Sequence, residues 1–188
     1  MLLPIFASGV AHRVRSYIER GHSPLRQTCP SCDGLDMTNL PGHQALRKGR
    51  TSIPGQIYLL TTTTANRTPW FHDVELARAT SQLMIARKTW GDARPLCWVL
   101  MPDHWHGLIE LGERDSLPLV VNRFKSITSK HLRQAGQIPP IWARGFHDHA
   151  LRRDEDVRAA AHYIIANPLR AKLANRTGDY PYWDCIWL

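Results

Sequence analysis

The amino-acid sequence predicts an α+β fold built on one sheet, followed by an added C-terminal helix. Three observations predict this fold: runs of β-branched and aromatic residues, apolar residues at helical spacing, and the order in which these segments alternate. The expected segments are a strand at 56–64, a helix at 73–90, strands at 96–101 and 104–111, a helix at 117–134 and a strand at 141–147. This β-α-β-β-α-β order is the split βαβ, or ferredoxin-like, sandwich.

The local sequence supports each segment in turn. The first strand contains Ile57, Tyr58 and a run of threonines, which favour extended backbone, and the first helix repeats apolar residues every three to four positions. The second strand is an unbroken apolar run, and the third alternates after a Pro-Asp turn, so the two form a hairpin. The second helix carries a basic face, and the fourth strand again mixes apolar and aromatic residues.

The added helix is expected at 154–167. Its first three residues are acidic, which suits the positive end of a helix dipole. Asn167 is followed by Pro168, and proline cannot continue a helix. The helix therefore begins and ends at positions that its own sequence specifies.

The chain divides into two parts of different composition. Residues 1–45 lack sustained periodicity, and we expect an N-terminal extension that is poorly ordered. Either this extension is real, or Met37 is the natural first residue. Cys29 and Cys32 form a single C-x-x-C in it; a structural zinc site needs two further ligands, and the spacing of the candidates His22 and His43 fits no established zinc pattern. Residues 46–188 form the expected functional domain.

Composition and charge restrict the class of protein. The 188 residues are 43% hydrophobic and carry a net charge of +8, which favours a polyanionic partner such as nucleic acid. No stretch approaches the roughly 20 apolar residues that a membrane-spanning helix needs. We expect a cytoplasmic, nucleoid-associated protein. Cys97 and Cys185 lie among apolar residues and are expected to be buried rather than reactive.

The tripeptide His104-Trp105-His106 is the most specific chemical signal. Residues i and i+2 of a strand point to the same face, so the two imidazoles project side by side and Trp105 points into the core. Two neutral nitrogen ligands can hold one divalent cation and leave positions open for phosphate oxygens. An isolated His-x-His is common, so the signal becomes specific only with a third ligand and a nucleophile.

The added helix supplies both. Its core stripe is Val157, Ala160, Ala161 and Ile164, and Tyr163 lies on the adjacent stripe, with Asn167 one turn later. Tyr163 is the expected nucleophile, and the amide oxygen of Asn167 is the expected third metal ligand. Attack by the phenol on a phosphodiester, assisted by a cation, would give a covalent phosphotyrosine that retains the ester-bond energy.

Four segments together resemble a known family. Residues 101–109, which contain the two histidines, resemble the HUH motif (histidine, hydrophobic residue, histidine) of single-tyrosine transposases. Residues 163–173 resemble the tyrosine helix of one branch, the REP-associated tyrosine transposases, and residues 53–58 and 142–149 resemble that branch too. The similarity covers about residues 46–188.

The resemblance implies a ferredoxin-like nuclease that cuts and rejoins single-stranded DNA with Mg²⁺ or Mn²⁺. It implies DNA with a hairpin from repetitive extragenic palindromes (REP) and a short tetranucleotide beside the hairpin. His104 and His106 correspond to the metal ligands and Tyr163 to the nucleophile. Asn167 departs from the glutamine of the insertion-sequence branch and has a shorter side chain. Members of the family act as monomers or as homodimers.

Basic residues that flank these segments are the expected DNA contacts. They are Arg47, Lys48, Arg50, Arg123, Lys125, Arg144, Arg152, Arg153, Arg170 and Lys172. Two other functions stay open. One is a non-catalytic nucleic-acid-binding module with the same ferredoxin-like sheet. The other is a zinc hydrolase that uses an activated water and carboxylates such as Asp103 or Asp148.

Overall fold

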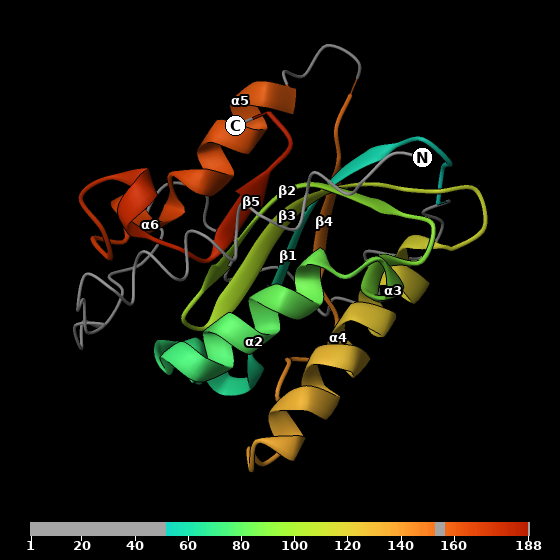
Figure 1. Ribbon diagram of the computed structural model, residues 1–188. Coiled ribbons are helices and arrows are strands. Elements are labelled where there is room, and N and C mark those ends of the chain that lie inside the picture. The colour runs from blue at the N-terminus through green and yellow to red at the C-terminus, as the bar shows by residue number, and fades with distance from the viewer. Residues whose placement is uncertain (1–51, 153–156, 188) are drawn as a thin grey trace, which may run out of the picture.

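A computed structural model describes residues 52–152 and 157–187, which form one sheet with helices on both faces (Figure 1). The sheet has the strand order β4-β1-β3-β2-β5, and all neighbouring strands are antiparallel. Its strands are β1 (Ile57–Thr63), β2 (Arg94–Met101), β3 (His104–Glu110), β4 (His147–Ala150) and β5 (Trp183–Cys185). The order β4-β1-β3-β2 is that of the split βαβ fold, so the predicted ferredoxin-like class is confirmed.

The helices lie in two layers. Figure 1 shows α2 and α4 on one face of the sheet and α5 on the other. The helices are α2 (Val74–Ile85), α3 (Arg87–Trp90), α4 (Leu117–Gln134), α5 (Val157–Ile165) and α6 (Asn167–Arg170), with short 3₁₀ turns at Ala65–Arg67 (η2), Trp70–His72 (η3) and Thr177–Asp179 (η4). Within the described residues, no helix is both long and apolar enough to span a membrane.

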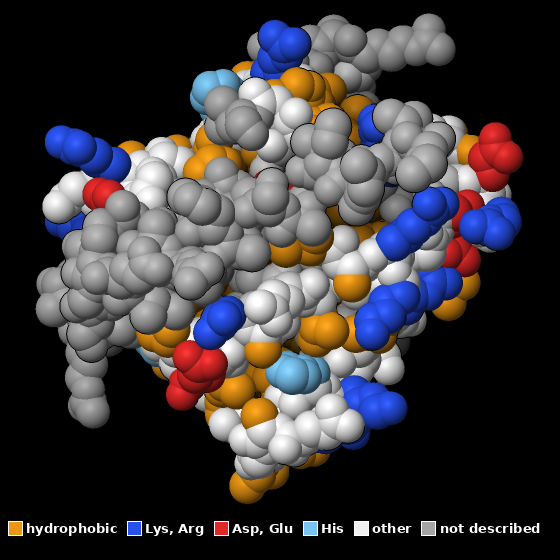
Figure 2. Space-filling view, in the orientation of Figure 1, with side chains coloured by type: hydrophobic (Ala, Val, Ile, Leu, Met, Phe, Trp, Pro, Cys, Tyr) orange, Lys and Arg blue, Asp and Glu red, His pale blue; other side chains and the backbone are white. Residues whose placement is uncertain are grey.

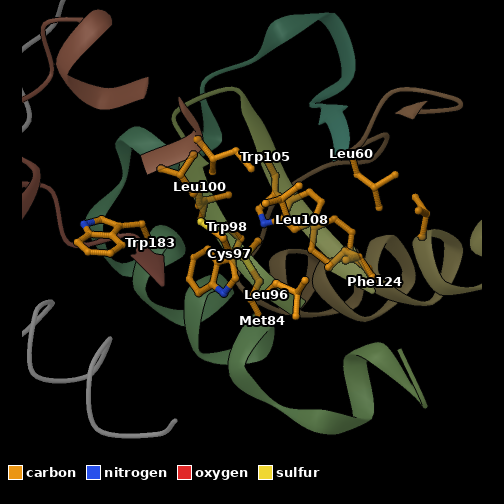
Figure 3. Packing of buried hydrophobic residues seen from close by; sticks show 14 of the residues in the cluster. Leu60, Met84, Leu96, Cys97, Trp98, Leu100, Trp105, Leu108, Phe124 and Trp183 are labelled. Carbon is orange, nitrogen blue, oxygen red and sulfur yellow. The ribbon is translucent and has the colours of Figure 1, made fainter. Parts of the chain in front are cut away.

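An aromatic cluster fills the space between the sheet and α4. The Phe124 ring lies 5.0 Å from the Trp105 ring, centroid to centroid (Figure 3). The Trp90 ring lies 5.4 Å from the Phe124 ring. Trp142 extends the cluster, with its ring 5.3 Å from Phe124 and its Nε1 donating to Thr128 Oγ1 at 2.8 Å. Trp105 is 1% exposed. The prediction that Trp105 points into the core is therefore confirmed.

The helix expected at 73–90 is broken, and this part of the prediction was wrong. Ala86 adopts an extended conformation between α2 and α3. Two side chains at the end of α3 bind carbonyls of the last turn of α2: Thr89 Oγ1 donates to Leu83 O and Trp90 Nε1 donates to Met84 O, both at 2.6 Å. The break also places Trp90 in the aromatic cluster.

The strand expected at 141–147 was also misplaced, since β4 begins only at His147. Trp142 forms an isolated bridge to Thr64, and the chain then turns at Gly145, which has a φ of +73°. Lys125 Nζ donates to the carbonyls of Ala143 and Gly145, so these groups are bound by a side chain rather than by a neighbouring strand. Strand β5 was not predicted.

Two cysteines occupy directly opposite positions on β2 and β5. Cys97 lies opposite Cys185 in the register, and both side chains are buried, as predicted, and not joined by a disulfide. The hydrogen bond to Cys185 and burial raise the pKa of Cys97, so its thiol stays protonated. The predicted extension at 1–45 and the acidic start of the last helix at 154–156 lie outside the described residues.

Gly107 makes room for the Trp105 ring, and this generates a stability prediction. A Cβ at residue 107 would lie 2.3 Å from Trp105 Cζ2. We expect Gly107→Ala to lower the free energy of unfolding by about 1–3 kcal/mol, because the indole must move within a packed cluster. Urea titration of the variant and the parent protein measures this change.

Gly178→Ala is the matched control, because no atom lies within 4 Å of the added Cβ there. The same titration should give a change within roughly 0.5 kcal/mol for this variant. Equal stabilities for Gly107→Ala and Gly178→Ala would contradict the packing account.

Candidate active site

Strand β3 presents His104 and His106 on the face opposite Trp105. Within the antiparallel pairs, Met101 lies opposite His104 and Val99 opposite His106. The two imidazole centroids are 4.7 Å apart and the ring planes are nearly perpendicular, at 85°. The two rings are therefore neighbours on one face, as the sequence predicts.

Each imidazole is held by a protein group at Nδ1. His104 Nδ1 lies 2.5 Å from Asp103 Oδ1, and His106 Nδ1 lies 2.7 Å from the hydroxyl Oγ1 of Thr61 on β1. A carboxylate or hydroxyl at Nδ1 fixes the ring orientation and leaves Nε2 to bind a metal. The residues present thus fit a cation bound by the two Nε2 atoms.

Electrostatics keeps His106 in the form that a metal requires. Burial, followed by the charges of His104, Arg170 and Arg67, holds the pKa of His106 well below its usual value. Its imidazole is therefore neutral at pH 7 and keeps a lone pair for a cation. For Asp103, burial opposes ionisation, but the hydrogen bond with His104 and the charges of His104 and Arg67 outweigh it and lower the pKa.

Helix α5 covers the same face of the sheet as the two histidines. Cys97 lies opposite Leu108, two residues beyond His106, so Cys97, Leu108 and His106 share a face. The Cys97 thiol lies 3.7 Å from the carbonyl oxygen of Ala161 in α5. The helix that carries Tyr163 therefore packs beside the histidine pair, whereas α4 packs on the opposite face.

Tyr163 differs from the other described tyrosines in its exposure. Tyr163 is 48% exposed, whereas Tyr58, Tyr180 and Tyr182 are only 5–6% exposed. The Arg170 guanidinium lies 3.9 Å from the centroid of the Tyr163 ring, and its Nη2 donates to the Tyr163 carbonyl at 2.9 Å. The charge of Arg170 also contributes to the lowered pKa of His106.

Asn167 is buried where α5 ends. Residue 168 is proline and cannot donate to the Ile164 carbonyl, and Asn167 Nδ2 donates to it instead, at 3.0 Å. The same Nδ2 lies 3.3 Å from the Tyr163 carbonyl. Both of these bonds use the amide nitrogen, so the amide oxygen stays available for the predicted role as third ligand. That role stays a prediction.

The predicted DNA contacts fall into three groups. Arg123 pairs with Asp115 at 2.7 Å and Lys125 binds backbone carbonyls, so both have a structural role in or beside α4. Arg144, Arg152, Arg170 and Lys172 are exposed, and Arg47, Lys48, Arg50 and Arg153 lie outside the described residues. Figure 2 shows Lys and Arg side chains gathered over α3 and α4, on the layer opposite the histidine pair. DNA contact by these residues stays a prediction.

Sequence reasoning missed three contacts around the histidine pair. Thr61 on β1 lies directly opposite His106 on the adjacent strand β3. In the sequence, only the threonine run at 61–64 pointed to this contact. Asp103 binds the ring of His104. The two residues are adjacent in the sequence, but only the geometry of the turn shows that their side chains meet. Arg67 lies in η2 and pairs with Asp103 at 3.2 Å, which no local pattern predicts.

Paired imidazoles on one face of a ferredoxin-like sheet, and an exposed tyrosine on the helix that covers that face, define a candidate DNA-cutting enzyme of the single-tyrosine class. The chain belongs to the IS200-like transposase family, whose model matches residues 53–167, more than half of the chain. The predicted resemblance is thereby confirmed at the level of the family, and a transposase is a DNA-cutting enzyme.

The chain is also similar to individual proteins. The chain is 29% identical, over 125 residues, to a REP-associated tyrosine transposase of Escherichia coli K12, covering 60% of this chain and 73% of that one. An uncharacterized protein of Haemophilus influenzae is 28% identical over 94 residues, which cover 38% of this chain and 52% of that protein. A solved REP-associated tyrosine transposase bound to a REP hairpin has the same fold, with a TM-score of 0.59, 22% identity, and coverage of 71% of this chain and 79% of that one.

The Asp103 contact predicts a change in metal affinity. Asp103→Asn keeps the shape of the side chain but removes the charge that orients His104, and we expect Mn²⁺ affinity to fall by about 10- to 100-fold. Isothermal titration with Mn²⁺ measures this without any DNA.

Glu110→Gln is the matched control. Glu110 is a carboxylate at the other end of β3, paired with Arg94 at 2.8 Å. Its neutralisation should leave Mn²⁺ affinity within roughly twofold, as for a change away from the binding site. Equal losses in the two variants would show that the loss in Asp103→Asn reflects charge in general.

Proposed function

We propose that the protein cuts and rejoins single-stranded DNA beside a hairpin through a covalent bond between Tyr163 and a 5′-phosphate. The observation that carries this proposal is the pair of imidazoles held at Nδ1 by Asp103 and Thr61, on the sheet face that α5 covers. The family assignment and the exposure of Tyr163 support it.

The residues that would hold a cation are His104 and His106 through Nε2, with the Asn167 amide oxygen as the proposed third ligand. When bound, Mg²⁺ or Mn²⁺ would supply Lewis-acid polarisation of the phosphate and offset its developing negative charge. Asp103 and Thr61 orient the two rings before substrate arrives, so no reorganisation of the ligands is needed.

In the cutting step, the Tyr163 hydroxyl oxygen attacks the phosphorus of one phosphodiester. A bond forms between that oxygen and phosphorus, the bond from phosphorus to the 3′-oxygen breaks, and the phenol proton ends on the departing 3′-hydroxyl. One ester replaces another, so the energy of the bond is retained. Attack by a 3′-hydroxyl on the phosphotyrosine reverses these changes and rejoins the strand without ATP.

The proposed substrate follows from the relatives. Two of the proteins that this chain is similar to are named REP-associated tyrosine transposases, and one of them is bound to a REP hairpin. The net charge of +8 suits a DNA partner. We therefore propose a hairpin-bearing single strand from such repeats as the substrate, handled in the cytoplasm.

The two other functions fit the structure less well. A binding module of the RNA-recognition type displays aromatic residues on an open sheet face. Here α5 covers one face, and on the other Trp105 is buried against Phe124. A zinc hydrolase would need a further carboxylate or histidine ligand, and the described residues contain no group of three His, Cys, Asp or Glu residues placed to hold a metal.

Tyr163→Phe should abolish the covalent adduct, because phenylalanine has no oxygen to attack phosphorus. The test incubates the protein with Mn²⁺ and a hairpin-bearing single strand labelled at the 3′ end, and detects label that migrates with protein in a denaturing gel. Adduct in the variant equal to that of the parent protein would rule out this nucleophile.

Tyr58→Phe is the control for loss of a phenol elsewhere. Its hydroxyl accepts a hydrogen bond from the Ile53 amide at 3.1 Å and is buried. We expect this variant to form adduct at a rate within roughly threefold of the parent protein, as for a modest loss of stability far from the reaction.

A further inference from the structure

Arg67 lies in a turn whose position the surrounding residues determine. The turn follows β1, whose last residue pairs with His104. Asn66 and Arg67 have φ values of 54° and 53°, in the left-handed region that non-glycine residues rarely adopt. Thr64 holds the turn, because its amide nitrogen donates to the Asp103 carbonyl at 2.8 Å and its hydroxyl lies 2.9 Å from the same oxygen.

One nitrogen of the Arg67 guanidinium is bound to Asp103, and the rest of the group is exposed to solvent. Nη1 donates to Asp103 Oδ2 at 3.2 Å, while Oδ1 of the same carboxylate lies against His104. The Arg67 side chain is 59% exposed. A guanidinium carries five N–H donors, so the group can bind a further anion without leaving Asp103.

The location of this guanidinium is close to the reacting centre. Arg67 Nη1 and His104 Nδ1 lie against the two oxygens of the same Asp103 carboxylate, so one side chain separates the guanidinium from a proposed metal ligand. Exposed ion pairs contribute little to stability, so the Arg67–Asp103 pair does not by itself account for a strained backbone. Strain of this kind is typically retained where it positions a functional group.

We propose that Arg67 is a phosphate-binding residue of the active site, and that its free N–H groups bind a non-bridging oxygen of the phosphate that Tyr163 attacks. This inference rests on the proposed function and adds a residue to it. Arginine matches the geometry of phosphate oxygens with two parallel N–H groups. Donors aimed at a phosphate oxygen stabilise the negative charge that develops there during transfer.

An indirect role, in which Arg67 acts only by holding Asp103, predicts different experimental results. If Arg67 acted only through Asp103, its loss would loosen His104 and weaken the binding of Mn²⁺ to the protein alone. If Arg67 binds the phosphate, Mn²⁺ binding to the protein alone stays as it was, and only the DNA complex and the reaction suffer.

The experiment compares Arg67→Gln with Arg114→Gln. Arg114 is also an exposed arginine beside an aspartate, at 3.4 Å from Asp92, and it lies beyond the other end of β3. Three quantities are measured for each: Mn²⁺ affinity without DNA, the affinity for a hairpin-bearing single strand with and without Mn²⁺ in a Tyr163→Phe background, and the rate of adduct formation with Tyr163 present.

We expect Arg67→Gln to keep Mn²⁺ affinity within about threefold and to lose roughly 10-fold in DNA affinity when Mn²⁺ is present, with a smaller loss when it is absent. The adduct rate should fall by about 100-fold or more, as for other donors to a developing oxyanion. Arg114→Gln should change none of the three by more than about twofold.

Two results would overturn the inference. One is DNA affinity and adduct rate in Arg67→Gln equal to those in Arg114→Gln. The other is a fall in Mn²⁺ affinity without DNA that accounts for the whole loss. The DNA affinities are measured without cleavage, so they decide on Arg67 even if the parent protein forms no adduct, a result that would reject the proposed function alone.

Discussion

The anchoring of Trp105 in the aromatic cluster is the constraint on which the site depends. Its ring packs against Phe124 and Trp90 and is almost fully buried. Because side chains alternate along a strand, this anchoring directs His104 and His106 to the other face and prevents a slip of β3 by one residue. Gly107 is part of the same arrangement, since any side chain there would collide with the indole.

On the histidine face, two different segments hold the imidazoles: Thr61 comes from β1 and Asp103 from the turn between β2 and β3. Helix α5, which carries Tyr163, covers this face. At the end of α5, the carbonyl of Tyr163 accepts a hydrogen bond from Arg170 and lies near the side-chain amide of Asn167. Proline at 168 therefore has a consequence beyond ending the helix, because it makes an Asn167 hydrogen bond to Ile164 necessary.

The sequence predicted the parts of the fold that local patterns encode. The hairpin of β2 and β3 and the helix α4 follow directly from an apolar run, an alternation and a helical repeat. The break at Ala86 was not predictable, because it depends on Thr89 and Trp90 binding carbonyls six residues earlier in the chain. The late start of β4 depends on Lys125 from a distant helix. Strand β5 is three residues long, too short for a pattern to be recognised.

For the site, the sequence predicted the residues that a strand or a helix places by its own period. His104, His106 and Tyr163 are of this kind. Thr61 and Arg67 reach the site only through strand register and a left-handed turn, so they have no local signature. For two basic residues, the sequence suggested a role that the structure assigns differently. Arg123 and Lys125 look like DNA contacts in sequence, but Arg123 is bound to Asp115 and Lys125 to backbone carbonyls.

The central claim is that one cation is held by both imidazoles, and the magnetic coupling between bound Mn²⁺ and histidine nitrogen tests it most directly. Pulsed electron paramagnetic resonance of the protein with one equivalent of Mn²⁺ should show coupling to two imidazole nitrogens. In His104→Ala one of the two couplings should remain, and in the double variant with His106→Ala neither should. Mn²⁺ bound without nitrogen coupling, or coupling that persists in the double variant, would contradict the account.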